Sequence, residues 1–274
     1  MALITVGVLA LQGAFVEHIH LLQKAATVQS DTETAGASEK FPSHRDSSHG
    51  TSFDFIQVRT PAELERCYAL VIPGGESTSM SLIAERCGLL EPLRDFVKFH
   101  RRPVWGTCAG LILLAESANK SKATGQELIG GLDVRVQRNY FGRQVESFEA
   151  DLDLAFLKDG QPFHSVFIRA PVVEKVLPTV PGAQEKSHET VVAPAKKPTR
   201  AEVEILGRLP GRAQALKDHT TTAADLGEDG DIIAVRQGNV FGTAFHPELT
   251  SDARIHTWWL REVLDAVNAA ETRP

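Results

Sequence analysis

Cys108 lies in a short segment whose residue types suit a nucleophile. The segment is Gly106-Thr107-Cys108-Ala109-Gly110, with an apolar run on each side. G-x-C-x-G between a strand and a helix is typical of a nucleophile elbow, a turn so sharp that larger residues at the glycine positions would clash. The following helix would place the thiol at its N-terminus, where partial positive charge favours the thiolate. The alternative is a buried, unreactive cysteine, and the flanking glycines favour the nucleophile.

His246 and Glu248 offer a base and a group to orient it. They stand two positions apart in AFHPELT, residues 244–250, at the end of an apolar run. Residues i and i+2 of an extended chain point the same way, and Pro247 favours that conformation at His246. Glu248 would then accept a hydrogen bond from one imidazole nitrogen while the other faces the thiol. Taken alone, the tripeptide is better explained as an ordinary turn.

The segment VIPGGESTSM, residues 71–80, offers a third component of an acyl-transfer site. Glycines after a strand allow backbone N–H groups to approach a ligand closely. An oxyanion needs such donors, here expected from Gly75 and from Ala109, the residue after the nucleophile. By itself the segment also fits a glycine-rich turn. It is not a phosphate-binding loop, because no G-x-x-x-x-G-K-[ST] pattern is present.

Short apolar runs alternate with helical patterns around these segments. This alternation predicts an α/β fold with three layers, in which helices cover both faces of a mostly parallel sheet. A tight turn at 237–239 predicts a hairpin between the last two strands. The predicted strands are 3–11, 53–58, 68–72, 103–107, 231–238 and 240–246, and the predicted helices are 14–25, 77–88 (with a capping serine at its start), 91–100, 109–117 and 253–270.

Composition predicts one domain over residues 1–274, with polar surface insertions at about 27–52 and 179–230, where apolar residues are few. The formal net charge of −6 argues against a nucleic-acid partner. Three cysteines with no CxxC or Cys/His spacing predict neither a disulfide framework nor a metal site. The first apolar run resembles a buried strand more than a signal peptide, and no run suits a membrane span. We therefore expect a cytoplasmic protein.

The combination of G-x-C-x-G, H-x-E and an upstream P-G-G loop resembles the class I glutamine amidotransferases. Other segments are similar to one branch, the glutaminase subunits of pyridoxal 5′-phosphate synthase. Among these the stretch RNYFGRQVESFEADL is the most specific. The similarity covers most of the chain outside the polar insertions, and the segments are 7–19, 73–80, 105–115, 138–152, 166–171 and 245–252.

The resemblance implies a class I glutamine amidotransferase fold, which is flavodoxin-like, and a glutaminase activity without a cofactor. Cys108 would attack the side-chain amide of L-glutamine, His246 would pass the proton to ammonia, and Glu248 would orient His246. Ammonia would go to a separate synthase subunit, a (β/α)8 barrel, for synthesis of pyridoxal 5′-phosphate (vitamin B6).

The resemblance also implies the residues that bind glutamine. Arg138 is chemically suited to clamp a carboxylate, because guanidinium presents a planar fork of donors. Without the resemblance, a solvated surface arginine is nearly as good an explanation. Gln12 would help to gate activity on partner binding, and the binding residues would be Gly75, Glu76, Ser77, Arg138, Ile168 and Arg169.

Two other functions fit parts of the pattern. One is a cysteine-dependent γ-glutamyl hydrolase or an amidotransferase subunit of another pathway, against which RNYFGRQVESFEADL argues. The other is a subunit without activity that only binds a partner, which the three catalytic residue types disfavour. Cys67 and Cys87 match no motif and are expected to be structural. His18 and His20, on the first helix, are expected to serve packing or the surface, and remain only candidate interface residues.

Overall fold

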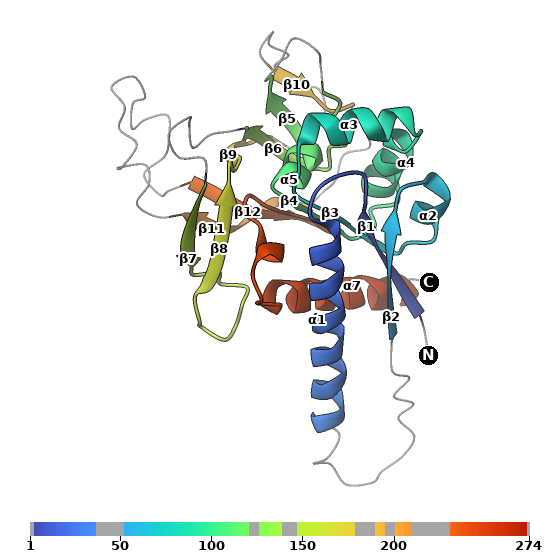
Figure 1. The fold of residues 1–274 in the computed structure, drawn as a ribbon, viewed down its shortest axis with the longest axis vertical. Coiled ribbons are helices and arrows are strands. Elements are labelled where there is room, and N and C mark those ends of the chain that lie inside the picture. Colours follow the sequence, from blue (N-terminus) through green and yellow to red (C-terminus); the bar gives the residue numbers. More distant parts are fainter. Residues whose placement is uncertain are drawn as a thin grey trace.

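The structure is a computed structural model that describes residues 3–36, 52–120, 126–138, 147–178, 190–194, 201–209 and 231–272. An α/β fold is present, as predicted (Figure 1). The described helices are α1 Phe15–Gly36, α2 Pro61–Glu65, α3 Ser77–Arg86, α4 Leu90–Arg94, α5 Ala109–Leu114 and α7 Arg254–Glu271, with a π-helical turn η2 Asp95–Phe99 and a 3₁₀ turn η3 Pro247–Leu249.

Eleven of the described strands form the central sheet. Its order is β10-β5-β6-β9-β12-β13-β4-β3-β1-β2, and β11 pairs separately with β12. The strands are β1 Leu3–Leu9, β2 Ser52–Val58, β3 Ala69–Ile72, β4 Val104–Thr107, β5 Ala115–Asn119, β6 Leu132–Gln137, β9 Val172–Val176, β10 Thr190–Val192, β11 Val203–Leu209, β12 Asp231–Gln237 and β13 Val240–Thr243.

Five neighbouring strands, β2-β1-β3-β4-β13, are all parallel. Their order is that of flavodoxin-like sheets, in which ligands bind beyond the carboxyl ends of the strands. Beyond β13 the pairing is mostly antiparallel, beginning with the predicted hairpin of β12 and β13 around Gly238. A site is therefore expected beyond the carboxyl ends of the five parallel strands.

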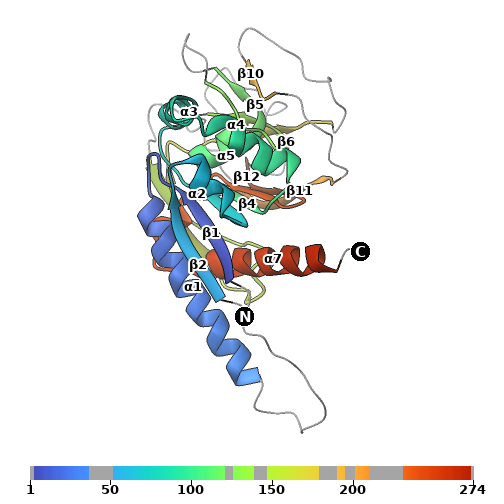
Figure 2. The same ribbon diagram turned by 90° about the vertical axis from the view of Figure 1, so that its right-hand side faces the viewer.

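Helices cover both faces of the parallel half (Figures 1 and 2). Alternate residues of β4 point to opposite faces. Trp105 packs against His256 and Trp259 of α7, while a side chain at Gly106 would meet Gly110 of α5. The helices α1 and α7 therefore share one face, and α3, α4 and α5 share the other. This confirms the predicted three layers.

A separate antiparallel pair, β7 Ser147–Leu152 and β8 Phe163–Ile168, packs beside the central sheet. Phe148 and Phe167 stack across the pair, and Phe167 also contacts Phe245. The carbonyl of Val166 on β8 accepts a hydrogen bond of 2.8 Å from the backbone N–H of His246. The small sheet thus holds the segment that follows β13.

The predicted helix 109–117 is wrong over its last three residues. Helix α5 ends at Leu114, and β5 begins at Ala115. The strand lies between β6 and β10, with Ala118 fully buried. Pairing with two neighbouring strands outweighs the local preference of this segment for helix. The predicted helix 91–100 also changes type, because α4 passes into the π-helical turn η2.

The predicted insertions are wrong in part. Helix α1 runs through Gly36, ten residues into the stretch 27–52, and β2 begins at its last residue. Within 179–230 two strands belong to the central sheet, because β10 pairs with β5 and β11 pairs with β12. Both strands carry apolar side chains that pack on the core, among them Val191, Val203 and buried Leu209. Residues 37–51, 179–189, 195–200 and 210–230 lie outside the described part of the chain.

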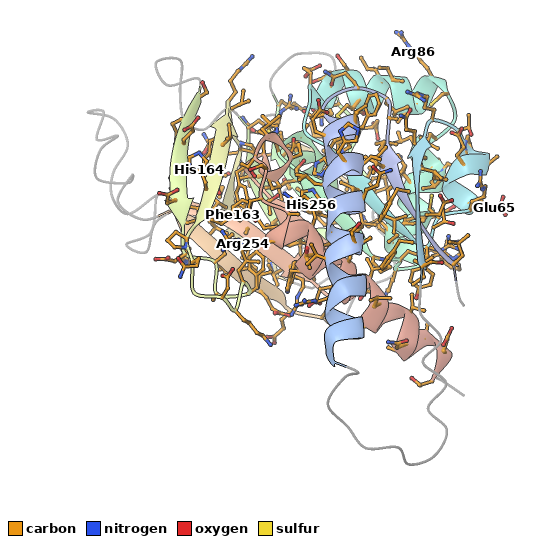
Figure 3. The ribbon with its side chains drawn as sticks, turned by 60° about the horizontal axis from the view of Figure 1, so that its bottom comes forward. Glu65, Arg86, Phe163, His164, Arg254 and His256 are labelled. Carbon is orange, nitrogen blue, oxygen red and sulfur yellow. The ribbon has the colours of Figure 1, made fainter. Side chains whose placement is uncertain are left out.

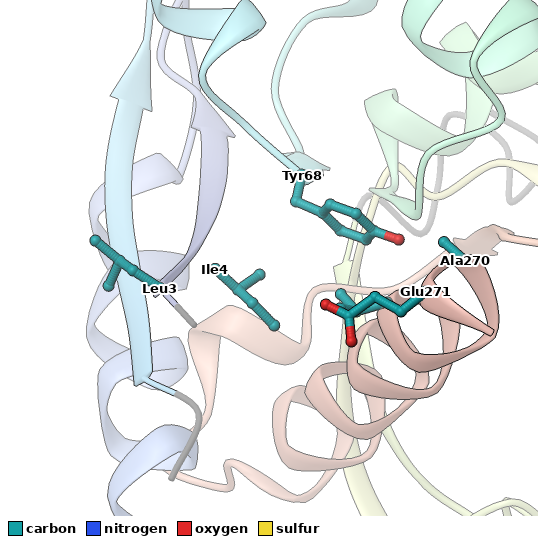
Figure 4. A pocket seen from close by; sticks show the side chains of 6 residues that line it. Leu3, Ile4, Tyr68, Ala270 and Glu271 are labelled. Atoms are coloured by element: carbon teal, nitrogen blue, oxygen red, sulfur yellow. The ribbon is translucent and has the colours of Figure 1, made fainter. Parts of the chain in front are cut away.

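A hollow of about 340 Å³ opens at the start of β1 (Figure 4). The hollow lies at the amino ends of the parallel strands, whereas Cys108 follows the carboxyl end of β4. The hollow and Cys108 therefore lie at opposite ends of the strands. The adjoining chain ends, 1–2 and 273–274, are not described. The lining residues are Leu3, Ile4, Tyr68, Val267, Ala270 and Glu271.

Candidate active site

Cys108 occupies a strained turn between β4 and α5. Its φ of 47° and ψ of −98° lie outside the regions that residues with a side chain prefer. A β-carbon on Gly110 would lie 2.1 Å from the carbonyl oxygen of Ile72, and one on Gly106 would lie 2.5 Å from the carbonyl carbon of Gly110. Both glycines are therefore required for steric reasons, as predicted for a nucleophile elbow.

His246 and Glu248 form the predicted pair, although the backbone differs from the prediction. Nδ1 of His246 lies 2.7 Å from Oε1 of Glu248, and both residues are buried. The chain does not continue as an extended strand, because β13 ends at Thr243 and Pro247 starts the 3₁₀ turn η3. Proline suits the first position of such a turn, where its missing N–H is not needed.

The charges of the pair stabilise one another. Burial opposes a charge on His246, but hydrogen bonding to the Cys108 and Glu248 side chains raises the pKa of the imidazole to about 10. Burial likewise opposes ionisation of Glu248, but the neighbouring His18 and His246 hold the pKa of its carboxyl well below its usual range. With Nδ1 bonded to Glu248, Nε2 is the nitrogen of His246 left for Cys108.

His18, which the sequence analysis assigned to packing or the surface, lies in contact with this pair. Its Nε2 is 3.3 Å from Oε2 of Glu248 and 3.3 Å from Oγ1 of Thr107, and its Nδ1 is 3.0 Å from Nε2 of His256. Both histidines are fully buried. Only the fold brings them to the site, because His18 and His256 are 238 positions apart.

The loop after β3 packs directly against the base. A β-carbon on Gly74 would lie 2.2 Å from Cε1 of His246, and one on Gly75 would lie 2.5 Å from Oε1 of Gln12. Gln12 accepts a hydrogen bond of 2.7 Å from the backbone N–H of Glu76. Gln12 therefore fixes the loop in which the predicted oxyanion donor Gly75 lies, and Ala109 follows Cys108 as the first residue of α5.

Glu76, and not the predicted serine, caps helix α3. Its carboxylate accepts hydrogen bonds from the N–H of Thr78 at 3.0 Å, the N–H of Ser79 at 2.7 Å and the hydroxyl of Ser79 at 2.6 Å. Although burial opposes the charge, these bonds lower the pKa of Glu76 to about 2. Ser77, by contrast, is buried and directs its hydroxyl to Gln126.

Arg138 is buried next to the start of α3. One guanidinium nitrogen donates to Oε1 of Gln126, and the other lies 3.3 Å from Oγ1 of Thr78. Burial lowers the pKa of Arg138, and the charge of Glu76 opposes this change. Nε2 of Gln126 is buried without a hydrogen-bond partner among the described residues. The sequence analysis missed both partners, because Gln126 lies in no motif and Thr78, although within the segment 71–80, was not singled out there.

Ile168 and Arg169 border the thiol at the end of β8. Sγ of Cys108 lies 3.9 Å from the carbonyl oxygen of Ile168, and the Ile168 side chain is exposed. Arg169 has a φ of 44°, a conformation unusual for a residue with a side chain, and is exposed. The backbone of β8 thus lies beside the nucleophile.

The other cysteines lie apart from these groups. Cys67 is buried and donates to the carbonyl of Glu63 at 3.3 Å, and burial raises the pKa of its thiol to about 12. Cys87 ends α3 and is exposed. In the part of the chain that the structure describes, no cluster of His, Cys, Asp and Glu suits a metal ion. Nor is any described helix both long and apolar enough for a membrane span.

Comparisons with known proteins agree with this geometry. The family model described as the SNO glutamine amidotransferase family matches residues 8–203 and 201–265. A crystal structure of a glutamine amidotransferase is similar with a TM-score of 0.60 at 33% identity, covering 94% of this chain and 98% of that chain. The predicted class I glutamine amidotransferase fold is therefore confirmed.

Curated relatives extend over most of the chain. The probable pyridoxal 5′-phosphate synthase subunit PDX2 of Arabidopsis thaliana is 39% identical, with 94% of this chain and 85% of that protein covered. The pyridoxal 5′-phosphate synthase subunit PdxT of Herpetosiphon aurantiacus is 38% identical, with 93% and 98% covered. The family model and these relatives together show that the chain belongs to the SNO glutamine amidotransferase family.

Proposed function

We propose that the protein is a glutaminase that hydrolyses L-glutamine to L-glutamate and ammonia through Cys108, His246 and Glu248. The observation that carries the proposal is the strained elbow at Cys108 beside His246, whose far nitrogen is bonded to buried Glu248. A thiol, a base and an orienting carboxylate in this order are what acyl transfer by a cysteine requires.

In the proposed reaction the Cys108 thiolate attacks the side-chain amide carbon of glutamine. The oxyanion that forms is stabilised by the backbone N–H groups of Gly75 and Ala109. When the C–N bond breaks, Nε2–H of His246 donates its proton to the leaving group, which departs as ammonia. His246 next takes a proton from water, and the hydroxide attacks the thioester. Collapse of that intermediate releases glutamate and restores the thiolate.

Substrate binding is proposed for the groups around the elbow. Arg138 suits the α-carboxylate of glutamine, because burial strengthens the attraction between its guanidinium and an anion. Glu76, Ser77 and the backbone at Ile168 and Arg169 complete the proposed binding residues. Gln12 is proposed to gate activity, and its hydrogen bond to the N–H of Glu76 supports this role.

Ammonia is proposed to pass to a second subunit, the (β/α)8-barrel synthase that makes pyridoxal 5′-phosphate. Support comes from the relatives, whose names call them subunits of pyridoxal 5′-phosphate synthase. The proposed location is the reducing cytoplasm, which suits the three free cysteines.

The test is a glutaminase assay on the full chain, alone and with the synthase subunit. We expect slow release of glutamate alone, a faster rate with the partner, and no activity in Cys108→Ala. An electrophilic glutamine analogue should form an adduct on Cys108. Preference for γ-glutamyl peptides over glutamine would instead support the γ-glutamyl hydrolase. No adduct on Cys108, even with the partner present, would support a subunit that only binds.

A further inference from the structure

Glu248 uses only one of its two oxygens to hold His246. The other oxygen, Oε2, is buried and has no well-aligned hydrogen bond among the described residues. Nε2 of His18 lies 3.3 Å from this oxygen. A carboxylate oxygen buried without a donor is costly, so His18 is the group placed to satisfy it.

Contacts with three neighbouring side chains hold the ring of His18 in place. It lies on α1, and its ring meets Trp105 edge-on at a centroid distance of 5.3 Å. His256 of α7 contacts its Nδ1 at 3.0 Å, and Thr107, which precedes the nucleophile, lies 3.3 Å from its Nε2. Figure 3 shows His256 in the interior of the molecule, among densely packed side chains. The His18 ring therefore has one well-defined place beside Glu248.

The contacts favour one arrangement of protons. If Nε2–H of His256 donates to Nδ1 of His18, then Nε2 of His18 carries a proton that faces Thr107, and Oε2 of Glu248 lies 3.3 Å from the same nitrogen. Nδ1 of His256, which lacks a hydrogen-bond partner, is then an unprotonated acceptor. The reverse arrangement, in which Nδ1–H of His18 donates to His256, would leave a buried N–H on His256 without an acceptor, a costlier defect. Burial lowers the pKa of His256, which agrees with a neutral ring.

We propose that His18 is a positioning residue that fixes the carboxylate of Glu248 through its second oxygen, and thereby fixes the ring of His246 for its proton transfers. The inference rests on the proposed function and deepens it. The chain of contacts runs from α7 through His256, His18, Glu248 and His246 to Cys108. The titratable groups that face His18 are His256 from α7 and Glu248 from η3, with His246 beyond Glu248.

Two substitutions of the same residue separate positioning from packing. In His18→Gln the amide nitrogen reaches about as far as Nε2 and can still donate to Glu248. In His18→Asn the amide reaches only the place of Nδ1, so the contact with His256 survives and the one with Glu248 is lost. His20→Asn is the matched control for measurements without the synthase partner, because His20 is exposed on the same helix and is a candidate interface residue only.

We expect His18→Asn to lower kcat for glutamine hydrolysis by roughly 10–100-fold, the usual loss when an orienting partner is removed, with KM nearly unchanged. His18→Gln should stay within about threefold of the unmodified protein, since it keeps the donor. Assays use the full chain with its synthase partner, and thermal unfolding reports the folded fraction. Equal losses in both variants, accounted for by unfolding, would overturn the proposal.

The second readout does not need glutamine. The rate at which iodoacetamide alkylates Cys108, followed by peptide mass spectrometry against pH, reports the charge on His246. In His18→Asn the alkaline limb should move to lower pH, because a poorly oriented carboxylate stabilises the imidazolium less. His18→Gln and His20→Asn should keep the original profile. If the pH profile shifts in His18→Asn but the protein hydrolyses no glutamine, the proposed glutaminase activity is refuted and the positioning role of His18 is kept. An unshifted pH profile in folded His18→Asn would refute the positioning role of His18 and leave the proposed glutaminase activity untouched.

Discussion

Nδ1 of His246 and Oε1 of Glu248 lie 2.7 Å apart, and Pro247 alone separates the two residues in the chain. Both groups come from one short turn, whereas the nucleophile comes from the end of another strand, β4. A substitution at Glu248 therefore changes the orientation and charge of the base without changing the elbow. The pair also follows β13, the parallel neighbour of β4, which places base and nucleophile beyond the carboxyl ends of adjacent strands.

Glu248→Gln should lower kcat for glutamine hydrolysis by roughly 10²–10⁴-fold, because a neutral amide neither stabilises the imidazolium nor fixes its tautomer. KM should change little, since Glu248 is buried and is not among the proposed glutamine-binding groups. Glutamate release with the synthase partner measures both constants, and circular dichroism confirms folding. A folded variant with kcat within threefold of the original would remove Glu248 from the proposed mechanism.

Gly110→Ala should destabilise the protein by about 1–3 kcal/mol, because the new methyl group would clash with the carbonyl of Ile72. The rate at which Cys108 is alkylated should also fall. Gly88→Ala is the control. Unlike Gly110, Gly88 has a positive φ, but it meets no atom within 4 Å, so only backbone strain of about 1 kcal/mol is expected there. Urea unfolding and alkylation kinetics measure both effects. Equal behaviour of the two variants would show that the close approach at Ile72 is not needed.

The elbow could be predicted from sequence because its cause is local. Gly106 and Gly110 are required by clashes within the turn and with the adjoining strand, so their spacing around Cys108 identifies it. The pairing of His246 with Glu248 was predicted too, but on an extended backbone that the 3₁₀ turn replaces. Two residues this close in sequence can bring their side chains together in several backbone conformations, so the contact was easier to predict than the backbone.

Other features depend on contacts between distant segments and leave no local signal. The end of α5 at Leu114 is set by strands on both sides of β5. A histidine within a helical pattern gives no indication of what it faces, so the contact of His18 with Glu248 could not be predicted. The same holds for Gln126 beneath Arg138, which comes from a different segment of the chain.

Arg138→Lys should raise KM for glutamine by roughly 10–100-fold with little change in kcat, because lysine keeps the charge but loses the planar fork for a carboxylate. Arg135→Lys provides the control, since Arg135 is partly exposed and pairs with Glu174 at 3.0 Å. Initial rates over a range of glutamine concentrations separate KM from kcat. An unchanged KM in Arg138→Lys would place the substrate carboxylate elsewhere.

Stability should fall at alkaline pH through His246. Its pKa in the folded protein, about 10, lies above the ordinary value of 6.5, so the bound proton favours the folded state. This contribution is complete below about pH 6.5 and is lost as the pH rises through about 10. Urea unfolding from pH 6 to 10 in the unmodified protein and in His246→Asn isolates the contribution of His246 with its partners, because titrating groups that do not contact His246 cancel. Parallel curves for the two proteins would show that His246 keeps an ordinary pKa.

A buried ion pair away from the site should contribute to stability in a non-additive way. Nζ of Lys98, on η2, lies 2.6 Å from Oε1 of Glu116 on β5, and both side chains are less than one-tenth exposed. Lys98 also donates to the carbonyl of Pro194 at 2.7 Å, while Glu116 accepts from the N–H of Gly131 at 2.8 Å. The pair thus joins four segments of the chain.

Lys98→Met should destabilise the protein by about 3–5 kcal/mol, because it leaves the carboxylate of Glu116 buried without a counter-charge. Adding Glu116→Gln removes that charge and retains an acceptor for Gly131, so the double variant should recover much of the loss. Urea unfolding of the single and double variants completes the cycle. If the losses of unfolding free energy in the two single variants simply add in the double variant, Lys98 and Glu116 act independently. The ion pair would then not explain how these four segments are held together.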